Sequence, residues 1–340
     1  MAIGLLQNGL NLLNQFNYLF FMAGFANLGN TCYINTAIQC LAHCPSFARF
    51  FLKYNDEDDG DLLGQLKDVI LKIWSCHGSV IRPHRLLNVI AKSYGTMMDV
   101  FEENDIHEFI SILVDKINQK ASEKKSIATC DMMSPVSGTV SIDKLGSRLD
   151  KSWSLHFKTH LSPFVPMLHG QSITQMRCGH CQKIFHNFEA FVILTLSMTS
   201  PSLVGCVDDY YKQEILSHWK CDRCELSVDS KRSQKLWRTP TILILCLKRF
   251  TNRRSKLSRE IIISESLDMS EYMMIGDKSN GMYDLYSIAC HNGSTGGGHY
   301  HALCKLPNAE WRKYDDCHIN LIPFPEKTPS GYMFFYHKRL

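Results

Sequence analysis

The sequence predicts an α+β fold, because helix-like patterns fill its first half and strand-like patterns its second. Between residues 34 and 117, apolar side chains recur three and four positions apart, which is the spacing of a helix that buries one face. Between residues 190 and 337, short apolar and β-branched runs are separated by residues that form turns. This order favours an α+β enzyme over a doubly wound sheet, in which helices and strands alternate along the chain.

Three helices and five strands are expected from these patterns. The first helix has apolar residues at positions 34, 37, 38 and 41, and Pro45 lies just past its end. The other helices are expected at residues 62–73 and 109–117. The strands are expected at residues 190–198, 241–250, 283–290, 300–306 and 331–337. Residues 116–150 are polar and without a period, so they are expected to form a variable loop or connector.

The chain has the composition of an ordinary globular protein. Of its 340 residues, 45% are hydrophobic and 21% are charged. A chain of this size buries about three quarters of its unfolded surface, which excludes a disordered chain, a collagen and a disulfide-stabilised miniprotein. The net charge of +4 is too small to indicate a nucleic acid or an anionic membrane as partner.

The first 21 residues form an uncharged extension in which apolar residues are interleaved with asparagine and glutamine. The positive segment that opens a secretory signal is missing, and no apolar run is long enough for a membrane span. The extension is expected to pack against the main body, with contact to a partner or a membrane surface as the alternative. The chain is expected inside the cell, in the cytoplasm or nucleus, where cysteines stay reduced.

Residues 231–259 contain ten lysine or arginine residues and no acidic residue. Such a stretch could bind nucleic acid, but an apolar strand runs through it, and only Trp237 and Phe250 could stack on bases. A solvated or partner-facing loop is therefore favoured over a nucleic-acid site.

Two Cys-x-x-Cys pairs, Cys178 with Cys181 and Cys221 with Cys224, predict a tetrathiolate zinc site. Two residues between the thiolates allow one tight turn to aim both sulfurs at a single tetrahedral ion. The 39 residues between the pairs must then form a subdomain that the metal fastens at its tip. A redox Cys-x-x-Cys needs only one pair, and a reducing compartment disfavours disulfides, so one structural zinc ion is favoured.

Cys32 is a candidate nucleophile because it falls at the start of the first expected helix, with Asn30 or Thr31 in the capping position. The free amides and the dipole of a helix start favour a thiolate, so a cysteine there gains acidity. The alternative is a buried cysteine that only packs, and this segment alone does not decide between the two.

A base for Cys32 is expected from a hairpin near the end of the chain. Three glycines at positions 296–298 precede His299 and leave no side chains beside it, so an extended substrate backbone could approach closely. If the hairpin folds about residues 307 and 308, position 315 or 316 lies opposite His299, and both are aspartates. A histidine oriented by a carboxylate is the arrangement that activates a thiol.

In these motifs the sequence resembles the ubiquitin-specific protease family of cysteine deubiquitinases. The NLGNTCYIN segment around Cys32 is similar to the family's Cys box, and GGHYHA followed by WRKYDD is similar to its His box. The LKRF segment, the closing GYMFFY strand and the paired cysteines also match, in the family's order. The resemblance implies a papain-like cysteine protease core with a helical thumb and an antiparallel β palm, from which zinc-clipped β fingers extend.

The resemblance runs from about residue 22 to the end of the chain and implies how the domain is divided. The expected parts are a thumb at 22–125, a connector at 126–165, fingers with the zinc site at 166–245, and a palm with the His box at 246–340. Such a domain grasps ubiquitin while the ubiquitin tail enters the cleft between thumb and palm. It is expected to act as a monomer, with no cofactor in the chemistry itself.

Carried over residue by residue, the resemblance makes Cys32 the nucleophile, His299 the general base and acid, and Asp315 the residue that orients the histidine. Asn27 matches the side-chain donor of the oxyanion hole, and Asp316 matches a second acid that assists. The implied reaction is thiol-dependent hydrolysis of the amide after the terminal Gly-Gly of ubiquitin, in conjugates or in chains.

Substrate-binding residues are expected on both walls of the cleft: Asp105, Glu108, Phe109, Gly297, Gly298 and Tyr300. Glu103 and Asn104 replace the glutamines of the family's tail-binding motif, which bears on the choice of ubiquitin-like protein and not on the chemistry. A protease for another ubiquitin-like modifier is therefore one alternative, and a silent ubiquitin-binding scaffold is another. The complete set of triad residue types weighs against the scaffold.

Overall fold

The computed structural model describes residues 23–54, 59–75, 79–123, 144–158, 160–250, 255–274, 281–294 and 296–339. The N-terminal extension at residues 1–21 and the first half of the expected connector lie outside this described part. Among the described helices, none is both long and apolar enough to cross a membrane.

The helices gather in the first half of the chain, as expected. They are α2 (Cys32–Ala42), α3 (Pro45–Lys53), α4 (Leu62–Ser75), α5 (His84–Tyr94), α6 (Ile106–Glu123), α7 (Lys144–His156), α8 (Phe164–Leu168), α9 (Leu203–Tyr211) and the short 3₁₀ helix η2 (Ser270–Tyr272). The three helices predicted from apolar spacing are confirmed as α2, α4 and α6. The spacing of apolar residues does not predict α3, which begins at Pro45. Proline suits the first helical position, because its missing N–H is no loss there.

The strands form two main sheets. The larger is the palm sheet, whose hydrogen-bonded order is β14 (His318–Ile322), β13 (Trp311–Asp315), β12 (Gly297–Lys305), β11 (Met282–Ser294), β16 (Gly331–Lys338), β8 (Ile242–Leu247) and β5 (Ile193–Leu196), with β10 (Ser266–Asp268) also on β11. The finger sheet has the order β4 (Ile184–Phe191), β3 (Gly170–Arg177), β7 (Ser227–Arg238) and β6 (Glu214–Lys220). Two short pairs complete the set: β1 (Gly24–Phe25) with β2 (Val80–Ile81), and β9 (Ile261–Ile262) with β15 (Lys327–Thr328). Helices on a largely antiparallel sheet confirm the α+β fold.

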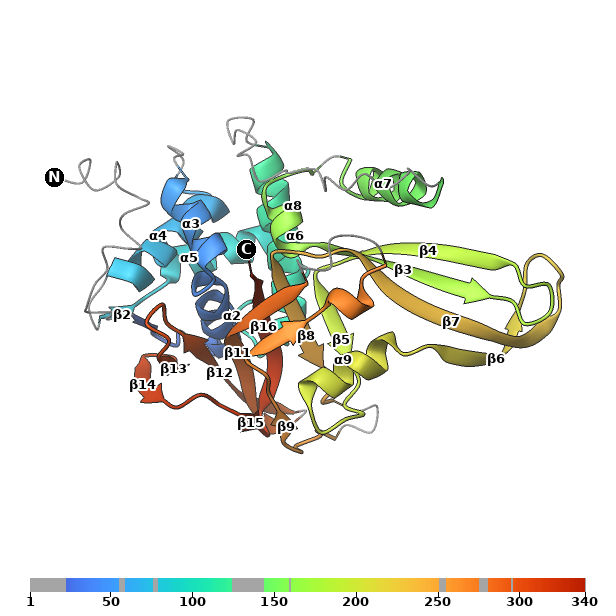
Figure 1. The fold of residues 1–340 in the computed structure, drawn as a ribbon. Helices are drawn as coiled ribbons and strands as arrows, with labels where there is room; N and C mark the ends of the chain where they lie inside the picture. The colour runs from blue at the N-terminus through green and yellow to red at the C-terminus, as the bar shows by residue number, and fades with distance from the viewer. Residues whose placement is uncertain are drawn as a thin grey trace.

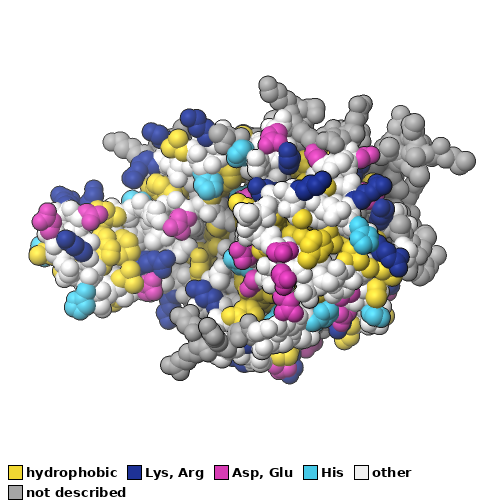
Figure 2. All heavy atoms as spheres, turned by 180° about the vertical axis from the view of Figure 1, so that it is seen from behind, with side chains coloured by type: hydrophobic (Ala, Val, Ile, Leu, Met, Phe, Trp, Pro, Cys, Tyr) yellow, Lys and Arg dark blue, Asp and Glu magenta, His cyan; other side chains and the backbone are white. Residues whose placement is uncertain are grey.

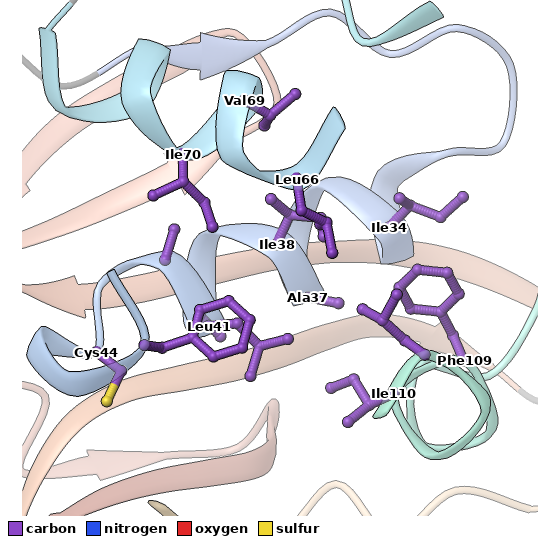
Figure 3. Close-up of a cluster of buried hydrophobic side chains, with 14 of the residues drawn as sticks. Ile34, Ala37, Ile38, Leu41, Cys44, Leu66, Val69, Ile70, Phe109 and Ile110 are labelled. Carbon is purple, nitrogen blue, oxygen red and sulfur yellow. The ribbon is translucent and has the colours of Figure 1, made fainter. Parts of the chain in front are cut away.

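Helix α2 lies at the centre of the body, and every one of its residues is buried. Figure 3 shows Ile38 of α2 close to Leu66 of α4, and the ring of Phe109 of α6 near Ile34 of α2. The opposite side of α2 packs against β12 of the palm sheet. A helix enclosed in this way has little freedom to move, so the residue at its start is held firmly.

Strand β8 is buried on both faces, which explains its uninterrupted apolar sequence. Its alternate residues enter two different hydrophobic clusters: Ile242, Ile244 and Cys246 face the helices, and Leu243, Leu245 and Leu247 face α9. The palm sheet is thus the middle layer between the helical body and α9 (Figure 1).

The single strand expected at residues 190–198 is two strands that belong to different sheets. Strand β4 ends at Phe191 in the finger sheet, and β5 begins at Ile193 in the palm sheet, so Val192 alone joins them. The apolar run continues across the junction because Phe191, Val192 and Ile193 are partly buried against the hydrophobic clusters of the body. The pattern of apolar residues alone could not show that the chain passes here from the finger sheet to the palm sheet.

The finger sheet projects from the body and has little core of its own (Figure 1). Ile173 and Leu236 are fully buried, whereas no residue of β4 or β6 is. A sheet with so little buried apolar area is marginal in isolation, so the fingers must be stabilised where they join the palm and at their tip.

The basic stretch at residues 231–259 does not form a uniformly positive face. Arg232 on β7 pairs with Glu214 at 2.7 Å, and Arg238 pairs with Asp150 of α7 at 2.6 Å. Figure 2 likewise shows basic and acidic side chains mixed at the finger tip.

Arg249 is a fully buried cation that ties the palm together. Its guanidinium donates hydrogen bonds to the carbonyls of Gly331 at 2.6 Å, Leu257 at 2.8 Å, Arg259 at 3.1 Å and Thr328 at 3.4 Å. In the described residues no carboxylate contacts it. One side chain therefore satisfies carbonyls of the segment before β9, of β15 and of β16.

Replacing Arg249 by Met is expected to lower the free energy of unfolding by about 3 kcal/mol, because several buried carbonyls lose their donor. Urea denaturation followed by circular dichroism measures the change. The control is Lys248→Met, which removes a neighbouring exposed cation and should cost less than about 0.5 kcal/mol. Equal losses in the two variants would contradict a structural role for Arg249.

Candidate active site

Cys32 is the first residue of α2 and is only 6% exposed. The chain reaches it through a tight turn, since Gly29 and Asn30 both have positive φ angles of 97° and 50°. Thr31 occupies the capping position but makes no side-chain bond to the helix. Its hydroxyl instead accepts from the Leu28 amide at 3.0 Å, so the turn and not the helix holds Thr31.

A cavity of about 330 Å³ opens beside Cys32, between the helices and the palm sheet. The helical side contributes Asn30, Cys32, Tyr33, Glu103, Asn104 and Asp105. The sheet side contributes Phe250, His291, Ser294, Gly297, Gly298 and Tyr300. Elements from opposite ends of the chain therefore meet at the candidate nucleophile.

The Cys32 thiol is less acidic than its position predicts. Burial raises the pKa of Cys32, and the negative charges of Asp316 and Glu103 raise it too. The backbone amides of Tyr300 and Tyr33 lower it, but they do not outweigh burial. The acidity expected from the helix start is thus not reached in the free protein, where Cys32 is a neutral thiol at pH 7.

His299 and Asp315 form a hydrogen-bonded pair, with Nε2 of the histidine 2.5 Å from Oδ1 of the aspartate. The expected register was wrong. Strands β12 and β13 pair with Ala302 opposite Tyr314, and continuing this register places residue 317 opposite position 299. Asp315 still reaches His299 because a two-residue offset keeps both side chains on the same face of the sheet.

The pair fixes the tautomer of His299. An ionised carboxylate can only accept, so Nε2 carries the proton and Nδ1 of the neutral ring is left as the base. In the described part of the chain, no hydrogen bond joins Cys32 Sγ to this ring. In the free protein, the hydrogen bond between His299 and Asp315 is therefore formed, whereas a hydrogen bond between His299 and the Cys32 thiol is not.

Asp315 is also paired with a lysine that the sequence analysis missed. Lys313 Nζ lies 2.7 Å from Oδ2 of Asp315. Burial raises the pKa of Asp315, but the hydrogen bonds from Lys313 and His299 outweigh it, so this pKa lies below its ordinary value. The sequence could have indicated this ion pair, because Lys313 and Asp315 are two residues apart on one strand and so share a face.

Asn27 and Asp316 contact each other directly. Nδ2 of Asn27 donates to Oδ2 of Asp316 at 2.9 Å, and its Oδ1 accepts from the Thr31 amide at 3.2 Å. Asn35, one helical turn after Cys32, donates to Oδ1 of Asp316 at 2.8 Å. The carbonyl of Asp316 also accepts from the Phe25 amide at 2.9 Å. Asp316 thus fixes the orientation of the Asn27 amide, and Asn27 is not among the residues that line the cavity.

The residues expected to bind substrate do not all reach the cavity. Gly297, Gly298, Tyr300 and Asp105 line it, and Oδ2 of Asp105 accepts from the Tyr332 hydroxyl at 2.8 Å.

Glu108 and Phe109 follow on α6, outside the cavity lining. Glu108 is exposed on the surface. Phe109 is fully buried, with its ring 5.4 Å from that of Tyr33 and 5.7 Å from that of Tyr94. The expectation that Phe109 contacts substrate is therefore wrong, because its side chain packs in the core behind Tyr33.

His291 is a buried cavity residue that sequence patterns did not single out. Its Nδ1 lies 2.9 Å from Lys256 Nζ, and its ring centroid is 4.5 Å from that of Tyr300. Burial and the nearby charge of Lys256 lower the pKa of His291 to about 4, so the ring is neutral at pH 7. A Cβ at Gly298 would lie 2.3 Å from His291 Nε2, which explains the glycine at this position.

The four paired cysteines meet at the finger tip. Cys178 Sγ lies 3.8 Å from Cys224 Sγ, Cys181 Sγ lies 3.7 Å from Cys221 Sγ, and all four sulfurs lie within 4.8 Å of one another. Sulfurs 2.3 Å from a common tetrahedral centre would be about 3.8 Å apart, so the cluster has the size that a bound metal ion requires.

The two turns that carry these cysteines have the same local structure. In each turn, the backbone amide four residues after the first cysteine donates to that cysteine's carbonyl. Gln182 donates to Cys178 at 3.2 Å, and Glu225 donates to Cys221 at 2.8 Å. Gln182 and Glu225 also share a φ angle of 58°. Two matching turns thus face each other across one cluster of four thiols that could hold a metal ion.

Cys32 of the free protein is expected to react slowly with iodoacetamide at pH 7, because its raised pKa leaves little thiolate. The alkylation rate, measured by mass spectrometry of the Cys32 peptide, should still be rising at about pH 9, beyond the ordinary cysteine pKa of about 8.5. Exposed Cys317 serves as the comparison within the same digest. A Cys32 rate that levels off below about pH 7 would show an acidic thiol and contradict this prediction.

Known proteins resemble the chain over most of its length. A family model described as ubiquitin carboxyl-terminal hydrolase matches residues 23–336. The Drosophila melanogaster hydrolase Usp2 is 27% identical over 335 residues, covering 93% of this chain and 35% of that protein. Human ubiquitin carboxyl-terminal hydrolase 2 is 25% identical over 340 residues, covering 93% of this chain and 55% of that protein. The chain thus spans between about a third and about half of these relatives.

Solved structures share the fold. The yeast SAGA DUBm with an Sgf73 mutant superimposes with a TM-score of 0.73 at 21% identity, over 94% of this chain and 69% of that one. The SAGA Ubp8/Sgf11/Sus1/Sgf73 DUB module bound to ubiquitin aldehyde gives 0.71 at 20% identity, over 100% of this chain and 75% of that one. With the family model covering nearly the whole chain, the protein belongs to the ubiquitin carboxyl-terminal hydrolase family and has the fold of its ubiquitin-specific proteases.

Proposed function

We propose that this chain is a thiol-dependent deubiquitinase that hydrolyses the peptide or isopeptide bond after the C-terminal Gly-Gly of ubiquitin. The observation that carries the proposal is the His299–Asp315 hydrogen bond. His299 is not itself part of the cavity lining, but it stands between Gly298 and Tyr300, which line the cavity together with Cys32. A histidine with its protonated nitrogen on a carboxylate keeps the other nitrogen available as a base, which a binding scaffold does not need. Membership of the family supports ubiquitin as the substrate.

The reaction begins when Nδ1 of His299 removes the proton of Cys32 and the thiolate attacks the carbonyl carbon of the terminal glycine. The resulting oxyanion accepts hydrogen bonds from the Asn27 side chain and the Cys32 backbone amide. His299 then gives the proton to the departing amine, which leaves a thioester on Cys32. Water, deprotonated by the same histidine, hydrolyses the thioester and releases ubiquitin.

The role of Asp316 in this scheme is to position Asn27. It holds Nδ2 of Asn27 at 2.9 Å and fastens α2 through Asn35, so the amide donor and the nucleophile share one anchor. A donor fixed before the reaction stabilises the oxyanion more than one that must be reoriented. The hydrogen bond between Cys32 and His299, absent in the free protein, forms when the ubiquitin tail fills the cavity and excludes water.

The walls of the cavity suit a tail that ends in two glycines. Gly297 and Gly298 present backbone only, so an extended substrate can approach closely there, and a side chain on the tail would have little room. A related modifier that also ends in Gly-Gly would meet the same wall, and it remains the second candidate because Glu103 and Asn104 replace the family's glutamines. Ubiquitin is the first candidate because the family's name and relatives point to it.

We further propose that the finger tip holds one structural zinc ion. Four thiolates suit zinc, and a closed set of four protein ligands leaves no position for a catalytic water. The ion would fasten the β3–β4 and β6–β7 turns of a sheet that has little core of its own. A reducing cytoplasm or nucleus fits this proposal, because Cys32 and the zinc ligands all require free thiols. The chain is proposed to act there as a monomer.

Incubation with ubiquitin that carries a thiol-reactive electrophile at its C-terminus is expected to give a one-to-one covalent adduct, detected by intact-mass analysis. Cys32→Ala should give none and should remain folded by circular dichroism, since alanine fits the buried helix start. Cys317→Ser removes an exposed thiol and should leave the adduct intact. If the folded wild-type chain forms no adduct with ubiquitin but forms one with another Gly-Gly modifier, that modifier replaces ubiquitin as the proposed substrate.

Metal analysis of the purified chain is expected to find about one zinc per chain. Cys221→Ser should lose the metal and make the fingers sensitive to limited proteolysis, because metal binding and folding of the tip are linked. Cys317→Ser is the matched control, since it removes a cysteine outside the cluster. A fully folded, protease-resistant protein with well under one zinc per chain would refute the structural role.

A further inference from the structure

We propose that Lys313 is a positioning residue of the proposed reaction, because it decides which of two histidines the Asp315 carboxylate orients. The inference rests on the proposed function and adds a residue to it. Lys313 lies on β13 and does not line the cavity, so it would act on the reaction only through Asp315.

Asp315 does not lie directly across the sheet from His299. Strands β12 and β13 pair with Ala302 opposite Tyr314, and continuing this register places Asp315 opposite His301. Residues 299 and 301 share one face of β12, so both rings are on the side of the carboxylate. Directly opposed Cβ atoms are about 5 Å apart, whereas diagonal neighbours are about 7 to 8 Å apart. The nearer histidine along the sheet is therefore His301, although the hydrogen bond goes to His299.

His301 could take the carboxylate if it were free to turn. The His301 side chain is only 6% exposed, and within the described residues its Nδ1 has no hydrogen-bond partner. Burial and the charge of Lys313 lower the pKa of His301 to about 4 against the opposing charge of Asp315, so the ring is neutral at pH 7. Either nitrogen of a neutral imidazole can carry the proton, so a bond to Asp315 would give this buried ring a partner that it lacks.

Lys313 holds the carboxylate in the orientation that His299 requires. Its Nζ lies 2.7 Å from Oδ2 of Asp315, while Oδ1 lies 2.5 Å from Nε2 of His299. With a partner on each oxygen, the carboxylate cannot turn about its Cβ–Cγ bond without losing one of them. The Lys313 and Asp315 side chains are 32% and 29% exposed, so solvent screens their ion pair less than it screens one on the open surface.

The neighbours of Lys313 leave it no competing acid. It lies opposite Leu303 on β12 and Asn320 on β14, and both are uncharged. In the part of the chain that the structure describes, Asp315 is the one carboxylate within ion-pair distance of its ammonium group. Removing this cation would release Oδ2, and the carboxylate could then turn to His301 and leave His299 without its orienting partner.

The first test measures kcat and KM for fluorogenic ubiquitin in wild type, Lys313→Met, His301→Val and the double variant. Lys313→Met is expected to lose about tenfold in kcat, which corresponds to the carboxylate staying with His299 in about one molecule in ten. KM should change by less than about twofold, because Lys313 lies outside the cavity lining. In the His301→Val background the same substitution should cost about threefold or less, since the competing ring is gone.

Two further variants separate this role from a general effect on the fold. Lys313→Arg keeps the cation and should restore most of kcat, whereas Lys327→Met removes an exposed ion pair with Glu260 on β15 and should leave kcat unchanged. Equal losses from Lys313→Met in the two backgrounds, or no loss in either, would overturn the inference. If wild type still cleaves ubiquitin in that experiment, the proposed function stands.

A spectroscopic test does not depend on turnover. Proton NMR of the chain with isotope-labelled histidine detects the imidazole N–H that is bonded to Asp315, because a strong hydrogen bond moves this proton to low field. His299→Ala should abolish the signal when Lys313 is present, and should leave a signal from His301 when Lys313 is replaced by Met. Loss of the signal in both backgrounds would refute the inference. The expected pattern in a folded chain that does not cleave ubiquitin would sustain the role of Lys313 and refute the enzyme.

Discussion

The junction at Asp316 holds the two halves of the site together. Its carboxylate accepts from Asn27 and Asn35, and its carbonyl accepts from Phe25, so the loop before Cys32 and helix α2 are fastened to the turn after β13. Asp315, immediately before it, orients His299. One short turn therefore sets the positions of Asn27, Cys32 and His299, which come from opposite ends of the chain.

Features that depend on local spacing could be predicted from the sequence. The period of apolar residues gave α2, α4 and α6, and the paired cysteines predicted a cluster that the fold assembles across two hairpins. The His299–Asp315 contact was also found, although the assumed turn was misplaced, because an error of two residues keeps a strand's side chains on the same face. The predicted contact survives the error in register because it requires only that His299 and Asp315 lie on the same face of the sheet.

Features that depend on three-dimensional surroundings could not be predicted. The helix start predicts a lowered pKa for Cys32, but burial and the charges of Asp316 and Glu103 raise this pKa. Both carboxylates come from distant parts of the sequence. Phe109 belongs to a motif associated with substrate, yet it packs between Tyr33 and Tyr94. A motif shows which residues occur together, whereas the direction of each side chain is decided by the packing around it.

The junction between the two sheets has a mechanical consequence. The finger sheet meets the palm through Val192 on one side and through residues 239–241, between β7 and β8, on the other. Both links are short, and Leu236 of β7 is buried in the same cluster as side chains of β8 and α9, so the base of the fingers is held by the palm while the far end carries the cysteine cluster. Because β5 and β8 are paired neighbours in the palm sheet, both links enter the sheet side by side, at the end of the strand order away from β12 and β13, which carry His299 and Asp315.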